Sequence, residues 1–198
     1  DAQLALHAIP ILRERARFIA ALEERARNLY AGIVGDEARG REKLGLRYQH
    51  FLKNADLTQT NEELTDYYRS RLENNLEDDL RRGQTSLGPH RDEMLITLSG
   101  KNARDFASQG QSRSCALALR LAEVHEMQAR TGEAPVVLLD DLASELDPER
   151  KRRVLQLLQP EWQTFLTTTR REDFALQSHF DATIVFETAG KAALRMED

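Results

Sequence analysis

The sequence contains one cysteine, and this scarcity excludes several kinds of protein. A single thiol cannot form an internal disulfide, and the chain has no zinc-ligand spacing of cysteines and histidines. This usage fits a reducing compartment and predicts a cytoplasmic protein. Cys115 falls inside an apolar helical pattern. We therefore expect a buried, inert thiol there and not a nucleophile.

Long apolar runs and an excess of positive charge are also missing. No stretch of 18 apolar residues occurs and no signal peptide is present, which argues against a membrane protein. The formal net charge of −5 over 198 residues gives no overall signature of nucleic-acid binding, so any DNA contact needs a local basic patch. Charged residues make up 31% and hydrophobic residues 40%, which is typical of one or two globular domains.

A phosphate-binding loop is the most informative absence. No Gly-x-x-x-x-Gly-Lys-Ser/Thr pattern occurs, although residues 32–45 are richer in glycine than the rest. The backbone cradle and the lysine for the β- and γ-phosphates of a nucleotide are therefore missing. The chain also lacks an initial Met and begins with a helical pattern, which indicates a fragment. We predict that it binds ATP weakly or not at all by itself.

An apolar run that ends in two carboxylates is the strongest positive signal. Val136–Leu139 precede Asp140 and Asp141. The run predicts a strand buried on both faces, as in a parallel sheet, and ligands of such sheets bind beyond the carboxyl ends of the strands. Mg²⁺ is usually held by one or two carboxylates and substrate phosphates, which makes this pattern typical of a Walker B strand. The alternative is that these residues only end the strand and cap the next helix.

A second signal lies at Phe106–Arg113. Ser108 is a good N-cap for the apolar helix that follows, and Gly110 lets the backbone approach a ligand closely. Unpaired N–H groups and the positive end of the helix dipole suit an anion. The segment is therefore a candidate phosphate-sensing turn. The alternative interpretation is an ordinary polar start of a helix.

The remaining pattern predicts an α/β protein with a helical arm. Residues 1–84 are expected to form a mainly α-helical antiparallel arm, in which Thr60–Glu63 form a capping box before the second long helix. Residues 85–198 are expected to form a lobe with a mixed, partly parallel sheet and helices. The ranges expected within these two units are strands at 44–52, 94–98, 136–141, 163–168, 181–188 and 191–196, a hairpin turn at 99–102, and helices at 109–131 and 148–159.

Four segments occur in the order seen in one protein family: SLGPHRDE (86–93), FASQGQSR (106–113), VVLLDDLASELD (136–147) and FLTTT (165–169). Together they resemble the RecF family, bacterial ATPases of DNA replication and recombinational repair in the SMC-like branch of the ABC ATPases. The combination is specific, because generic ABC transporters lack the GPHRD element and carry a different signature. The resemblance implies that residues 85–198 are the C-terminal lobe of an ABC-type ATPase head.

The resemblance also implies roles for individual residues. Asp140 would hold Mg²⁺ through its water shell. Asp141 stands where most ABC proteins have a glutamate that orients the attacking water, and its shorter side chain implies slow hydrolysis. Thr169 lies near the position of the switch histidine of transporters. The remaining implied sets are the signature that contacts ATP across a dimer (Ser108, Gln109, Gly110, Gln111, Arg113), the D-loop (Ser144, Glu145, Leu146, Asp147) and the family element (Gly88, Pro89, His90, Arg91, Asp92).

Two alternatives accompany these roles. In the first alternative, Arg91 and Asp92 are a pair that merely fixes its loop. In the second, Arg113 contacts phosphate or DNA, or caps its own helix. For the whole protein, the resemblance implies a weak DNA-dependent ATPase of the SOS response. It would bind gapped DNA at junctions of duplex and single strand as an ATP-bound homodimer, and help RecO and RecR load RecA. The candidate DNA contacts are Arg41, Lys43, Arg47, Lys53, Arg81 and Arg82.

Two other functional classes remain open at this stage. One is a non-enzymatic helical adaptor whose lobe has lost its nucleotide site. The other is an SMC-like chromosome-maintenance head, for which long coiled coils are expected. Two helices of about 20–25 residues reach only about 30–40 Å, which favours the short-armed RecF type.

Overall fold

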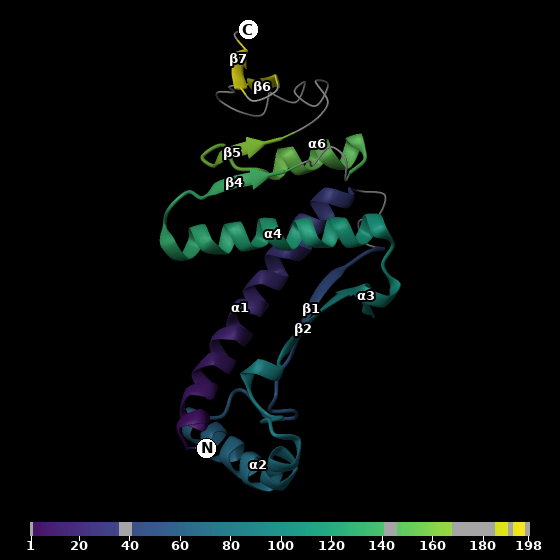
Figure 1. Ribbon diagram of the computed structural model, residues 1–198. Coiled ribbons are helices and arrows are strands. Elements are labelled where there is room, and N and C mark those ends of the chain that lie inside the picture. The colour runs from purple at the N-terminus through teal and green to yellow at the C-terminus, as the bar shows by residue number, and fades with distance from the viewer. Residues whose placement is uncertain (1, 36–40, 141–145, 168–184, 190–191, 197–198) are drawn as a thin grey trace.

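The computed structural model describes residues 2–35, 41–140, 146–167, 185–189 and 192–196 (Figure 1). Within them, no helix is long and apolar enough to cross a bilayer. The helices are α1 (Ala2–Val34), α2 (Asn61–Arg82), the 3₁₀ turn η1 (Pro89–Arg91), α3 (Ala103–Phe106), α4 (Gln109–Thr131) and α6 (Pro148–Leu157). The strands are β1 (Leu44–Gln49), β2 (Glu93–Leu98), β3 (Lys101–Asn102), β4 (Val136–Leu139), β5 (Gln163–Leu166), β6 (Val185–Ala189) and β7 (Ala192–Met196).

The long helix α1 runs through two separate hydrophobic clusters. Its N-terminal half packs beside α2 at the lower end of Figure 1, and its C-terminal half crosses α4. The lower cluster consists of Ala5, Ala8, Ile9, Leu12, Phe51, Leu52, Leu64, Tyr68 and Leu72. Pro10 lies inside α1.

The upper cluster forms the core around α4. Side chains from the second half of α1, from β1, α4, β4 and α6 meet there, together with the buried Trp162. Its fully buried members include Ala26, Tyr30, Ile33, Ala118, Ala122 and Val154. This core holds the N-terminal ends of α4 and α6 close to the C-terminal end of α1.

Local signals in the sequence produce the helix ends and the hairpin that we predicted. The hydroxyl of Thr60 accepts from the N–H of Glu63, and the Glu63 carboxylate accepts from the N–H of Thr60, which completes the capping box of α2. Strand β2 pairs antiparallel with both β1 and β3. Ser99 and Gly100 form the two-residue turn between β2 and β3 with φ of 50° and 80°, the sign that such a turn requires.

The acid-ended strand is shorter than predicted and differs in burial. Strand β4 ends at Leu139 and pairs in parallel with β5. Val137 and Leu139 face the core, whereas Leu138 is 73% exposed. The expectation of a strand buried on both faces is therefore wrong for the described residues, because only one face of the β4–β5 pair packs on the upper cluster. Strands β6 and β7 pair antiparallel.

The elements agree with the predicted fold class. Helices dominate, and the small parallel sheet of β4 and β5 lies with α6 beyond α4 (Figure 1). The expected boundary between residues 84 and 85 separates β1 from β2, which pair with each other over six positions. Helix α1 also contributes to both clusters. The division into an arm and a lobe remains a prediction.

Candidate functional site

The predicted phosphate-sensing turn is a capped helix start. The Ser108 hydroxyl accepts from the N–H of Gln111 at 3.3 Å, and the Gln111 side-chain oxygen accepts from the N–H of Ser108 at 2.8 Å. The N–H groups of Gln109 and Gly110 have no hydrogen-bond partner among the described residues. Two unpaired donors at the positive end of a 23-residue helix provide what an anion needs.

Gly110 lies against a guanidinium group from α6. The buried Ser114 hydroxyl donates to the carbonyl of Gly110 at 2.9 Å, and Arg150 Nη1 lies 3.5 Å from the same hydroxyl oxygen. A Cβ atom at position 110 would lie 3.0 Å from Arg150 Nη1. A side chain there would push the guanidinium away, so glycine keeps a positive charge beside the turn.

Arg150 also joins the turn to the end of the predicted D-loop. Asp147 caps α6 by accepting from the N–H of Arg150 at 2.9 Å, and its other oxygen pairs with Arg150 Nε at 3.4 Å. Pro148 occupies the first helical position, as predicted. Leu146 packs against the upper cluster. The other two D-loop residues, Ser144 and Glu145, lie outside the described residues.

Asp140 directly follows β4 and is exposed. The Thr167 hydroxyl, at the end of the neighbouring strand β5, donates to its Oδ1 at 2.5 Å. Among the described residues, no basic side chain pairs with Asp140, so its carboxylate stays accessible at the sheet edge. Asp141 and Thr169 lie outside the described residues.

The oxygen atoms at this edge of the sheet fit a Mg²⁺ ion that arrives with a nucleotide. The described part of the chain contains no group of three or more metal-ligating side chains. One accessible carboxylate beside a hydroxyl is nevertheless the kind of oxygen set that fits Mg²⁺, since this ion keeps most of its waters and takes further oxygens from a nucleotide. Asp140 therefore fits the ion of a nucleotide better than it fits an independent metal site.

Hydrogen bonds to the Asp92 side chain hold the Gly88–Asp92 element in place. The Asp92 carboxylate accepts from the Phe51 N–H at 2.8 Å, from the Tyr48 hydroxyl and from Arg15 Nη1 at 3.0 Å. Burial and the bond to Asp92 raise the pKa of Tyr48 above its ordinary range. Asp92 pairs with Arg15 of α1 and not with Arg91, the residue we had considered as its partner.

The rest of this element is held by backbone contacts. His90 Nε2 lies 3.0 Å from the carbonyl oxygen of Thr85, and Arg91 donates to the same oxygen at 3.4 Å. Both side chains belong to exposed residues. Gly88 has φ of 150°, and a Cβ atom there would lie 2.9 Å from His90 Cε1, so a side chain at this position would displace the imidazole.

Comparison with known proteins identifies the family. No family model matches the chain. The chain is 39% identical over 178 residues to the DNA replication and repair protein RecF of Roseiflexus castenholzii, and 39% identical over 170 residues to that of Staphylococcus epidermidis. This chain belongs to the RecF family. The two matches cover 89% and 86% of the chain but only 44% and 45% of the relatives, so the chain spans less than half of their length.

Solved structures support the same assignment. The recombination mediator protein RecF of the RecFOR pathway, in the form named RecF-ATP, matches 98% of the chain with a TM-score of 0.79 at 27% identity. The form named RecF-ATPrS matches all of the chain with a TM-score of 0.78 at 28% identity, and the chain covers about half of each. An SMC head bound to the C-terminal winged-helix domain of ScpA matches with a TM-score of 0.50 at 16% identity, which reflects the fold alone.

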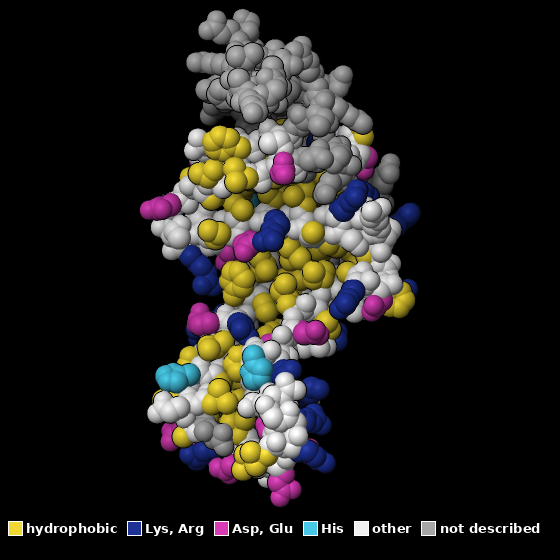
Figure 2. All heavy atoms as spheres, in the orientation of Figure 1, with side chains coloured by type: hydrophobic (Ala, Val, Ile, Leu, Met, Phe, Trp, Pro, Cys, Tyr) yellow, Lys and Arg dark blue, Asp and Glu magenta, His cyan; other side chains and the backbone are white. Residues whose placement is uncertain are grey.

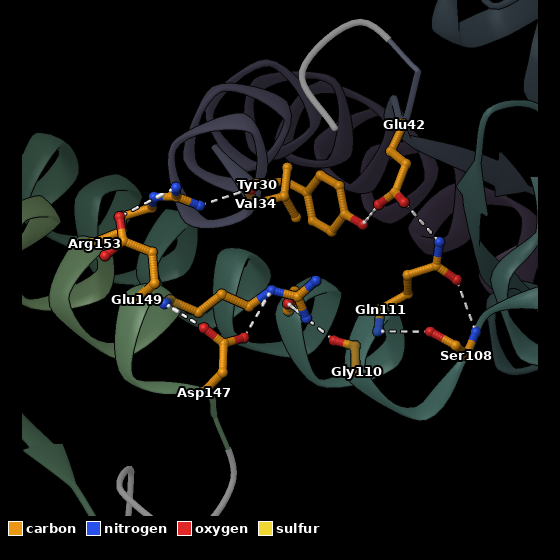
Figure 3. A network of polar contacts seen from close by, with 11 residues as sticks. Tyr30, Val34, Glu42, Ser108, Gly110, Gln111, Asp147, Glu149 and Arg153 are labelled. Atoms are coloured by element: carbon orange, nitrogen blue, oxygen red, sulfur yellow. Dashed lines mark hydrogen bonds and ion pairs between the residues drawn. The ribbon is translucent and has the colours of Figure 1, made fainter. Parts of the chain in front are cut away.

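Sequence reasoning missed the acidic partner of the turn in this RecF-family chain. Glu42 accepts from the Tyr30 hydroxyl at 2.6 Å and from Gln111 Nε2 at 2.8 Å (Figure 3). No motif surrounds Glu42, and it lies 69 positions before Gln111 in the sequence. Arg150 was also missed, although its place three residues after the helix cap Asp147 is a usable local signal.

The basic side chains proposed for DNA contact are all on the surface. Figure 2 shows Lys and Arg distributed along the whole described length of one face, with hydrophobic side chains exposed near β4 and β5. Arg81 pairs with Asp78 of the same helix. The six candidates are exposed at Arg41, Lys43, Arg47, Lys53, Arg81 and Arg82.

Proposed function

We propose that this chain carries one half of a composite ATP site in a DNA replication and repair protein. The observation that carries the proposal is the turn at Ser108–Gln111. The N–H groups of Gln109 and Gly110 have no partner among the described residues, and Gly110 lies against Arg150, which is bound by the helix cap Asp147. Relatives of this chain are named as DNA replication and repair proteins, and two solved relatives are named RecF-ATP and RecF-ATPrS. A turn of this kind favours a phosphate that another chain presents.

In this proposal ATP joins two copies of the whole protein. The phosphate-binding loop and Asp140 of one copy hold the nucleotide, and Ser108, Gln109 and Gly110 of the other copy contact its γ-phosphate. Because neither half of the site is complete alone, the presence of the γ-phosphate controls dimerisation. The D-loop residues from Ser144 to Asp147 would bridge the two sites.

Hydrolysis would be slow in this arrangement. Asp140 would hold Mg²⁺ through water, and the ion would neutralise charge on the β- and γ-phosphates. Asp141 would orient the attacking water with a side chain one methylene shorter than glutamate. Thr169 would occupy the region of the switch histidine of transporters. A weak DNA-dependent ATPase is therefore the activity that we propose for the complete protein.

We propose residues 1–84 as the arm and 85–198 as the lobe, with DNA bound on the closed dimer. Exposed Lys and Arg side chains would contact phosphates, which carry no sequence information and suit recognition of duplex and single-strand junctions by shape. Help in loading RecA, together with RecO and RecR, would follow from a position at gapped DNA. His90 and Arg91 are further candidates, because Asp92 fastens their loop while leaving both exposed.

Dimerisation tests the composite site directly. In a full-length RecF-family protein that carries these residues, Ser108→Arg places a bulky cation at the turn and should abolish ATP-dependent dimerisation in analytical ultracentrifugation. Ser70→Arg adds the same charge on the exposed face of α2 and serves as the control. Unchanged ATP-dependent dimerisation of the Ser108→Arg protein refutes the composite site.

A second measurement separates an ATPase from a helical adaptor. Asp140→Asn removes the accessible carboxylate at the end of β4 and should lower ATPase activity of the full-length protein about 100-fold or more. Asp105→Asn, exposed on α3, is the matched control. If the protein is an adaptor that has lost its nucleotide function, neither substitution should change its ATPase activity.

A further inference from the structure

Glu42 lies between the long helix α1 and the phosphate-sensing turn at the start of α4. One carboxylate oxygen accepts from the hydroxyl of Tyr30 at 2.6 Å, and the other accepts from Nε2 of Gln111 at 2.8 Å (Figure 3). Tyr30 is fully buried in the upper cluster. Glu42 is therefore anchored on a rigid core residue and reaches from there to the turn.

The chemistry of the carboxylate decides how the Gln111 side chain is oriented. A carboxylate only accepts hydrogen bonds, so it selects the orientation in which the amide NH₂ points to Glu42. The amide oxygen then points to the N–H of Ser108, which it accepts at 2.8 Å. The opposite orientation would set an oxygen against Glu42 and an NH₂ group against the N–H of Ser108. Glu42 therefore selects the amide orientation that completes the capping box.

The capping box in turn sets which amides are left for a ligand. With Ser108 N–H bonded to the Gln111 side chain and Gln111 N–H bonded to the Ser108 hydroxyl, two amides remain unpaired among the described residues, those of Gln109 and Gly110. If Gln111 swung away, the N–H of Ser108 would lose its partner and the first turn would lose one of its two caps. The shape of the anion site therefore depends on Glu42.

We propose that Glu42 is a positioning residue of the ATP-dependent dimer: it orders the Ser108–Gln111 turn to receive the γ-phosphate presented by the second copy. This inference rests on the proposed function of the turn. Through Tyr30, the same contact ties the turn to α1, whose other half is bonded to the Gly88–Asp92 element through Arg15 and Asp92. A movement of α1 would reach the turn by this route.

The negative charge of Glu42 would also act directly on the phosphate, and this effect would oppose the ordering of the turn. Glu42 would repel a phosphate, and its removal would then tighten ATP-dependent dimerisation. The two effects are separable with Glu42→Gln and Glu42→Ala. The glutamine variant loses the charge but retains an oxygen for Gln111 and an NH₂ group that can donate to the Tyr30 hydroxyl. The alanine variant loses both the charge and both hydrogen bonds.

The experiment measures the ATP concentration at half-maximal dimerisation of a full-length RecF-family protein that carries these residues. We expect Glu42→Ala to raise it about tenfold and Glu42→Gln to change it less than about twofold, with ATP binding to the monomer unchanged for both. Glu93→Ala, on the exposed end of β2, controls for loss of a surface glutamate. An equal decrease for the alanine and glutamine variants, or no change for alanine, overturns the proposal.

A double-mutant cycle keeps the test valid if Glu42→Ala lowers stability. Gln111→Leu removes the partner side chain and should give a similar increase in the ATP concentration. The double variant should be no worse than the Gln111→Leu variant within about twofold, because in the proposal Glu42 acts on the turn only through the Gln111 side chain. Additive effects overturn the proposal, since they would mean that the two residues act separately.

The Ser108→Arg variant distinguishes a failure of the composite ATP site from a failure of the proposed role of Glu42. If this variant abolishes ATP-dependent dimerisation while Glu42→Ala leaves it unchanged, only the role of Glu42 fails. If Ser108→Arg also leaves dimerisation unchanged, the composite site fails and the role of Glu42 fails with it.

Discussion

Asp92 is buried against Arg15, which lies 77 positions earlier in the chain. The side chain of Asp92 is 3% exposed, and it also accepts from the Phe51 N–H and the Tyr48 hydroxyl. The carboxylate thus joins α1, the segment after β1 and the Gly88–Asp92 element. The sequence predicts that Asp92 belongs to a functional element. Its contacts indicate that it stabilises the structure around that element.

Replacement of Asp92 should therefore lower the stability of the fold more than it weakens ATP-dependent dimerisation through the Ser108–Gln111 turn. Asp92→Asn sets an NH₂ group against donors in a buried site, and we expect the free energy of unfolding to fall by about 2–4 kcal/mol in urea denaturation. Asp66→Asn breaks an exposed pair with Arg69 and should cost less than about 0.5 kcal/mol. Equal effects of the two substitutions would contradict the structural role of Asp92.

The capping box of α2 predicts a pH dependence. The N–H and hydroxyl of Thr60 hold the pKa of Glu63 below its ordinary value. A carboxyl whose pKa is lower in the folded state stabilises the fold above its unfolded pKa and ceases to do so as the pH falls through the folded pKa. The stability difference between the wild-type chain and Glu63→Gln should be full above the ordinary pKa of a glutamate and should vanish as the pH falls through the lowered pKa of Glu63 in the folded state.

Thermal unfolding at several pH values checks this expectation. Glu62→Gln removes the same charge from the same helical turn, where no capping bond to Thr60 involves it. A difference for Glu63→Gln that persisted at the acidic end would show that its effect does not come from ionisation.

Cys115 should react slowly with thiol reagents in the folded chain. Burial, and then the charge of Glu42, raises the pKa of its thiol to about 11, and the side chain is buried in the upper cluster. At pH 8 we expect labelling by iodoacetamide to be at least about 100-fold slower than in denaturant, because the thiolate is the reactive form. The chain has no other cysteine, so mass spectrometry reports this site alone. Comparable rates in the two states would contradict its burial.

The two faces of β4 should respond differently to truncation. Leu139 is 8% exposed and packs in the upper cluster, whereas Leu138 on the other face is 73% exposed. Leu139→Ala should cost about 2–5 kcal/mol of unfolding free energy in the isolated chain, and Leu138→Ala less than about 0.5 kcal/mol. A large loss for both would restore the original expectation of a strand buried on both faces.

ATP binding by the 198-residue chain itself should be weak. The sequence contains no Gly-Lys-Ser/Thr loop to hold the β- and γ-phosphates. A titration with fluorescent ATP should show no saturation below about 1 mM, a concentration that corresponds to a binding free energy of only about −4 kcal/mol. A full-length RecF-family protein serves as the positive control. Tight 1:1 binding by the isolated chain would refute the division of the site between two halves.

Local features of the fold were predictable from the sequence because each depends on neighbours within a few positions. The caps at Thr60, Ser108 and Asp147 each bond the amide three residues later, and the turn at Ser99 and Gly100 needs only their own backbone freedom. The range of α4 was predicted to the residue for the same reason, since Ser108 caps one end and Gly132 the other.

The candidate site was predictable only in part. The order of the four sequence segments indicated the family, and the turn before α4 was recognised from its cap and its glycine. The hydrogen bond between Asp140 and the Thr167 hydroxyl could not be derived in the same way, because it joins the ends of two paired strands 27 positions apart. The roles of the site residues remain predictions for the experiments described above.

The sequence by itself determined where helices begin, where the hairpin turns and which family the chain resembles, because these follow from short-range hydrogen bonds and the order of motifs. Only the tertiary structure decided which face of β4 is buried, that Arg15 pairs with Asp92 and that Glu42 orients Gln111. Those relationships join residues on separate elements. Their formation depends on how hydrophobic packing brings α1, α4 and the strands together, which no local pattern encodes.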